Sequence, residues 1–124
     1  LIIEQYFGKN LLFCGSNSNK TLQKMLNNTI DEVICYDLVY SNFYVVDINK
    51  GPKIVLIYNY LTFSFIHEHI DHGILLEKIF IVSSQRIKEK IIKGFGNAKY
   101  LDMKIEVAES PSDESMLKKA KEFI

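Results

Sequence analysis

The chain contains no tryptophan, only two cysteines and two prolines, and no net charge, because 15 basic residues balance 15 acidic ones among its 124 residues. It also lacks a long hydrophobic run. The longest apolar stretch, Ile54–Leu61, already contains Asn59, whereas a membrane-spanning helix needs about 20 apolar residues. We therefore expect no membrane span. A nucleic-acid-binding protein normally carries a basic excess, so we expect no nucleic-acid partner either.

The two cysteines, Cys14 and Cys35, each fall in a predicted strand. The first residues, Leu1–Ile3, are followed at once by Glu4 and carry no basic leader like that of a secretory signal. These features favour a cytoplasmic location, where cysteines stay reduced. We interpret both cysteines as buried thiols rather than as a disulfide.

The length of the chain predicts one domain, residues 1–124. Runs rich in β-branched residues alternate with stretches of helical periodicity, which is typical of a parallel sheet covered by helices on both faces. Strands are predicted over 11–14, 32–37, 43–48, 53–60, 79–83 and 100–108, and helices over 1–7, 19–28, 62–78, 85–94 and from 110 onward. The predicted fold is a small three-layer, doubly wound, Rossmann-like α/β domain with a mainly parallel sheet of five or six strands.

Two local patterns sharpen this prediction near the C-terminus. Apolar and polar residues alternate over Tyr100–Ala108, which indicates a half-exposed strand at a sheet edge. The last helix starts at Ser110-Pro111-Ser112-Asp113, which combines an S-x-x-D capping box with proline at the first helical position.

A small polar loop follows the first predicted strand. It consists of Gly15, Ser16, Asn17, Ser18, Asn19 and Lys20. A loop between a strand and a helix exposes backbone N–H groups, which favour an anion. Asp37 ends the second predicted strand, where an acidic residue would hold a ribose hydroxyl. We therefore expect a nucleotide-type ligand here, such as a dinucleotide or S-adenosylmethionine.

Other interpretations of this loop stay open. It has one glycine where the dinucleotide fingerprint has three. The string through Thr21 resembles the end of a P-loop, but Cys14 and Asn19 replace both of its glycines, which argues against a nucleoside triphosphate site. The serines and asparagines could instead simply cap a helix. In that case the chain is a ligand-free structural or interaction domain.

All three histidines fall within the string His67-Glu68-His69-Ile70-Asp71-His72. This string matches H-x-H-x-D-H and resembles the first metal-binding motif of the metallo-β-lactamase superfamily. The resemblance implies a zinc-dependent hydrolase, in which two zinc ions activate a water. In that family arrangement, His67 and His69 would hold one zinc ion, and Asp71 and His72 would hold the other.

The same string also fits a helix without metal. Apolar residues recur at helical spacing and would share one face: Phe63, Ile66, Ile70 and Ile74. Glu68, His69 and His72 would then lie on the opposite, solvated face, with His67 and Asp71 as an i,i+4 pair at the border.

No acid–base pair or activated nucleophile stands out along the chain, so the sequence favours binding over catalysis and leaves enzymatic activity open. By analogy with other domains of this size and fold, we expect a homo-oligomer or an association with a partner subunit.

Overall fold

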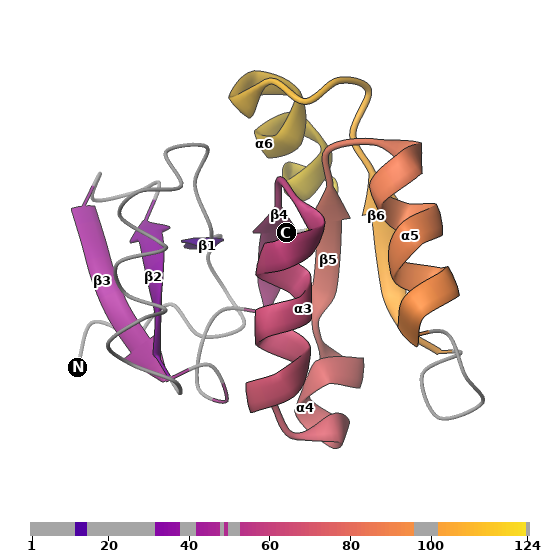
Figure 1. Cartoon of the computed structure of the whole chain (residues 1–124). Coiled ribbons are helices and arrows are strands. Elements are labelled where there is room, and N and C mark those ends of the chain that lie inside the picture. The colour runs from indigo at the N-terminus through magenta and orange to yellow at the C-terminus, as the bar shows by residue number, and fades with distance from the viewer. Residues whose placement is uncertain are drawn as a thin grey trace.

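The computed structural model describes residues 12–14, 32–37, 42–47, 49, 53–95 and 102–123. Its strands are β1 (Leu12–Cys14), β2 (Glu32–Asp37), β3 (Asn42–Asp47), β4 (Ile54–Ile57), β5 (Ile79–Val82) and β6 (Lys104–Val107). Its helices are α3 (Tyr60–His69), α4 (His72–Glu77), α5 (Gln85–Phe95) and α6 (Asp113–Lys121). The strands form two three-stranded sheets, with the orders β1-β2-β3 and β4-β5-β6 (Figure 1). The sheets adjoin, because β1 lies beside β4.

The second sheet has the predicted α/β architecture. Strands β4, β5 and β6 pair in parallel, with Ile54 opposite Ile79 and Ile79 opposite Lys104. Helices α3 and α4 connect β4 to β5, and α5 connects β5 to β6. These three helices pack on one face of the sheet, and α6 packs on the other. The prediction of a parallel sheet covered by helices on both faces is therefore confirmed for this part of the chain.

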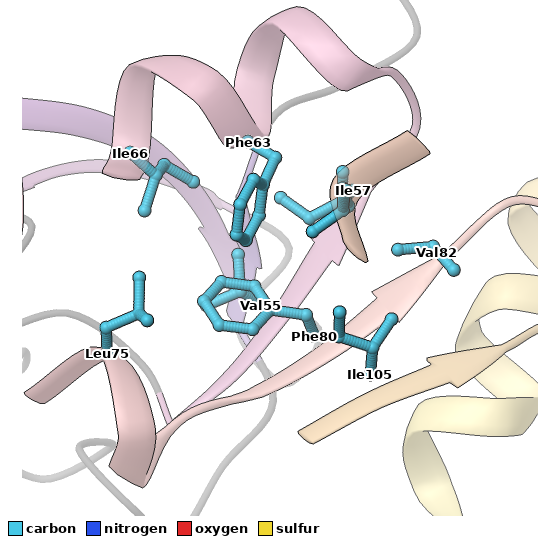
Figure 2. Packing of buried hydrophobic residues seen from close by; sticks show 9 residues of the cluster. Val55, Ile57, Phe63, Ile66, Leu75, Phe80, Val82 and Ile105 are labelled. Carbon is cyan, nitrogen blue, oxygen red and sulfur yellow. The ribbon is translucent and has the colours of Figure 1, made fainter. Parts of the chain in front are cut away.

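Successive residues of the central strands are buried on opposite faces, which explains why their sequences are continuous apolar runs. Val55, Phe80 and Ile105 point toward α3, α4 and α5, whereas Leu56 and Ile81 point toward α6. The larger core forms around Phe63 of α3, whose ring meets that of Phe80 edge-on at 5.2 Å between centroids (Figure 2). Burial of these strands on both faces holds the sheet between its two helical layers.

The first sheet differs from the prediction. Strand β2 pairs antiparallel with both β1 and β3, with Leu12 opposite Asp37 and Cys14 opposite Cys35. The mainly parallel sheet predicted for the whole chain is therefore wrong for these strands. Only residues 38–41 separate β2 from β3, and a parallel connection needs a crossover of a dozen or more residues. A hairpin is the only pairing that so short a connection allows.

The single helix predicted over 62–78 is two helices. Ile70 and Asp71 between them are extended, with ψ angles of 142° and 138°. Asn49 satisfies the backbone at this break, because its side chain accepts from Asp71 N at 2.8 Å and donates to His69 O at 3.5 Å. The apolar spacing predicted the helical conformation but not the break, which a residue about 20 positions upstream stabilises.

The start of α6 lies two residues later than predicted. Ser112 is the N-cap, and its hydroxyl accepts from Ser115 N at 3.1 Å. The Ser115 hydroxyl accepts in turn from Ser110 N at 2.9 Å. The N-cap is thus Ser112 rather than Ser110, and Pro111 precedes the cap instead of opening the helix.

This geometry makes a stability prediction. Ser112→Ala removes the cap acceptor and is expected to lower the free energy of unfolding by about 1 kcal/mol. Ser110→Ala keeps the backbone N–H that donates to Ser115 Oγ and removes only the exposed contact between the Ser110 and Ser112 hydroxyls at 3.0 Å. Its effect should therefore stay within about 0.5 kcal/mol. Urea unfolding followed by circular dichroism measures both. A larger loss of unfolding free energy for Ser110→Ala than for Ser112→Ala would instead support the capping box predicted at Ser110.

Candidate functional site

The carboxyl ends of β4, β5 and β6 lie at one edge of the parallel sheet, and each strand there leads toward a helix N-terminus. In open α/β sheets, ligands bind in the crevice beyond this edge. Mostly polar side chains follow the strands at this edge: Tyr58, Asn59, Ser83, Ser84, Ser110 and Ser112. It is therefore the candidate functional edge of the described part of the molecule.

A hydrogen-bond network, buried at Tyr58 and Ser83, joins the ends of β4 and β5 to the start of α6. The Tyr58 hydroxyl donates to Asp113 Oδ1 at 2.5 Å, and the Tyr58 carbonyl accepts from Ser83 Oγ at 3.0 Å. Tyr58 and Ser83 are 8% and 4% exposed. Burial, together with the hydrogen bond to the Asp113 carboxylate, raises the pKa of Tyr58 above its ordinary value. Tyr58 is thus a neutral hydrogen-bond donor at physiological pH.

Sequence patterns did not find the Tyr58–Asp113 contact. The two residues are 55 positions apart, and no motif or periodic pattern links them. The parallel sheet brings them together, because α6 begins beyond the same edge at which β4 ends.

Polar caps occupy the helix N-termini at this edge. Asn59 Oδ1 accepts from Thr62 N at 2.9 Å, and Ser84 Oγ accepts from Ile87 N at 3.3 Å. The first turn of α6 carries Asp113 and Glu114, whereas the first turns of α3 and α5 carry no acidic residue. Because the helix dipole places positive charge at an N-terminus, an anionic ligand is favoured near α3 and α5 over α6.

The predicted ligand loop, Gly15–Lys20, lies outside the described residues, and Asp37 lies at the end of β2. In a parallel βαβ unit, the loop and Asp37 would meet at one edge of the sheet. The antiparallel register instead pairs Asp37 with Leu12 and puts Cys14, which precedes the loop, opposite Cys35. Asp37 and the start of the loop thus lie at opposite ends of this ladder, which argues against a ribose contact by Asp37.

The histidine string spans the end of α3 and the start of α4, rather than the loop after a strand that the metallo-β-lactamase resemblance implies. His67 packs its ring against Phe95, with centroids 4.2 Å apart, so this histidine belongs to the aromatic packing between α3 and α5. His69 ends α3, and His72 is the first residue of α4. The α3–α4 break also separates His67 from Asp71, so the predicted i,i+4 helical pair does not form.

Within the described residues, which include the whole histidine string, no group of three or more His, Cys, Asp or Glu side chains is placed to hold a metal ion. The structure therefore lends no support to His67, His69, Asp71 and His72 as a zinc site.

The aromatic residues after β4 pack among themselves. Phe63 is fully buried, and Tyr60 stacks on Phe95 at 5.8 Å between centroids. The Lys90 ammonium lies 4.5 Å from the centre of the Tyr60 ring. Tyr60 and Phe63 therefore belong to the aromatic packing among α3, β5 and α5.

Comparison with protein-family models, curated proteins and solved structures gives no match for this chain. Inference about function therefore depends on the geometry described above.

None of the helices in the described ranges is long and apolar enough to cross a membrane.

Proposed function

We propose that the protein binds a nucleotide-type small molecule, such as a dinucleotide or S-adenosylmethionine, at the loop after β1. One observation carries the proposal: β1 lies beside β4, so the strands follow one another in space as β3-β2-β1-β4-β5-β6. Doubly wound dinucleotide-binding folds have the same order of strands within one sheet, and their ligand sits at the loop after the central first strand. Here β1 and β4 are neighbours but belong to two separately hydrogen-bonded sheets. The antiparallel β2 departs from those folds.

In this proposal, Gly15 lets the ligand approach the backbone closely, and Ser16, Asn17, Ser18 and Asn19 offer hydrogen bonds to a phosphate or carboxylate. Lys20 adds the matching charge. The ribose contact of Asp37 stays a prediction that the register of β1 and β2 disfavours. The N-terminus of α3 follows β4, the strand beside β1, and its first turn carries no acidic residue that would repel an anion.

We propose that the protein binds this ligand without catalysing a reaction on it. At the carboxyl edge of the described sheet, the polar side chains already have structural roles: Asn59, Ser84 and Ser112 cap helices, and Tyr58 bonds Asp113. A zinc-dependent hydrolase at His67–His72 has no comparable observation in its favour.

Isothermal titration calorimetry with NAD, S-adenosylmethionine and ATP tests the proposal. We expect NAD or S-adenosylmethionine to bind the wild-type chain. Lys20→Ala should weaken that binding about tenfold, because it removes a charge-assisted hydrogen bond. Lys24→Ala, which makes the same change four residues further along, should leave the affinity unchanged. The proposal would be refuted if none of the three ligands bound, or if both variants lost affinity equally.

A further inference from the structure

Strand β6 is the outer strand of the parallel sheet (Figure 1). Ala108 just beyond it donates its backbone N–H to Val82 O of β5 at 3.0 Å. Because backbone groups alternate in direction along a strand, the N–H groups of Lys104 and Glu106 also point toward β5. Those of Ile105 and Val107 point away from the sheet. Within the described ranges, β5 is the one strand with which β6 pairs.

The side chains of this strand make its edge self-complementary. Ile105 and Val107 belong to the core on the α5 side, so Lys104 and Glu106 lie on the face that α6 covers. Helix α6 packs there on β4 and β5, which leaves Lys104 exposed and Glu106 half-buried. In the described part of the chain, neither Lys104 nor Glu106 forms an ion pair, and the nearby Lys119 ammonium bonds Glu122 at 3.1 Å.

We propose that two copies of this chain associate through β6, antiparallel about Ile105. This register places the outward N–H and C=O of Ile105 opposite the same groups of the second copy, as a hydrogen-bonded pair. It also places Lys104 of each copy directly across from Glu106 of the other. That pair is of the non-hydrogen-bonded type, in which side chains approach most closely. The two parallel sheets then form one continuous six-stranded sheet.

Helix α5 supplies a second, independent argument for this face. Ile87, Ile91 and Phe95 of α5 pack on the sheet, and Lys90 and Gly94 adjoin Tyr60 of α3. At about 100° per residue, Ile92 lies on the flank of α5 opposite Lys90, beyond the edge of β6. Ile92 is 46% exposed. Across the twofold axis, the second copy's α5 would cover this flank.

Sedimentation velocity over a concentration series tests the proposal. We expect a species of twice the chain's 14.4 kDa, with a Kd of roughly 10 µM, because four-residue strands give a small interface. Lys104→Glu and Glu106→Lys each place like charges across the twofold axis, so each should weaken dimerisation at least about tenfold. The double variant Lys104→Glu/Glu106→Lys restores opposite charges and should dimerise as the wild type does.

Lys121→Glu makes the same charge change as Lys104→Glu, but at the end of α6, and should leave dimerisation unchanged. Amide hydrogen exchange locates the interface. Protection of the outward N–H groups of Ile105 and Val107 should rise with protein concentration, whereas that of Glu106, bonded within the monomer, should not. Any one of three results would overturn the proposal. They are a wild-type chain that stays at 14.4 kDa at about 0.5 mM, single variants that dimerise normally, and a double variant that stays monomeric.

Discussion

Replacement of Phe63 with alanine is expected to lower the free energy of unfolding by about 3–5 kcal/mol. Phe63 is fully buried and meets Phe80 at 5.2 Å and Phe95 at 5.3 Å between ring centroids, both edge-on contacts. It joins α3 to the central strand β5 (Figure 2) and, through Phe95, to α5. Loss of the ring leaves a cavity and removes two aromatic pairs at once. Since domains of this size have a total stability of about 5–15 kcal/mol, Phe63→Ala removes a large share of it.

Leu61→Ala is the matched control for this prediction. Leu61 lies two residues away on the same helix, and its side chain is 60% exposed. Its truncation should therefore change the free energy of unfolding by no more than about 0.5 kcal/mol. Urea unfolding followed by circular dichroism gives both values, with comparable m-values showing that the unfolding reaction is the same. Equal losses for the two variants would mean that Phe63 is not at the centre of the core.

Tyr58→Phe is expected to change how stability depends on alkaline pH. Below about pH 10 the variant loses the hydrogen bond to Asp113 and should be less stable than the wild type by about 1.5 kcal/mol. Burial and the Asp113 carboxylate raise the pKa of Tyr58 in the folded state, whereas in the unfolded chain its pKa is about 10. A tyrosine whose pKa is higher in the folded than in the unfolded state adds to the stability of the fold at every pH below its unfolded-state pKa. This contribution decreases as the pH rises above the unfolded-state pKa.

The wild type should therefore lose about 1.4 kcal/mol per pH unit above pH 10 through Tyr58, a loss that Tyr58→Phe does not show. The stability difference between the two proteins should shrink from pH 10 upward and vanish near pH 11. The other tyrosines are common to both proteins, so their ionisation cancels in the difference. Unfolding curves from pH 7 to 11 measure it, and a difference that stayed constant to pH 11 would contradict the raised pKa.

The predictions that succeeded depend on local patterns. Strand β2 occurs over Glu32–Asp37 as predicted, and β5 and α5 agree to within a residue at their ends. Runs of β-branched residues and the strong amphipathic pattern of α5 are properties of single segments. The secondary structure of these segments therefore does not depend on distant parts of the chain. The two helical layers of the β4-β5-β6 sheet follow from the alternation of such segments.

The predictions that failed required information about contacts between segments or about loop length. The direction of β2 relative to β3 depends on the four residues between them, which permit a hairpin and exclude a crossover. The α3–α4 break depends on Asn49, which supplies hydrogen bonds to His69 and Asp71 from outside the helix. The Tyr58–Asp113 pair depends on the complete sheet. None of these contacts leaves a periodic signal in the sequence.

The measurement that tests the proposed function most directly is a nuclear magnetic resonance titration of the isotope-labelled chain with NAD and S-adenosylmethionine. We expect saturable amide shifts concentrated in Gly15–Lys20, with smaller shifts at Asn59 and Tyr60 at the start of α3. Unchanged spectra, or shifts confined to His67–His72, would contradict binding at the loop after β1.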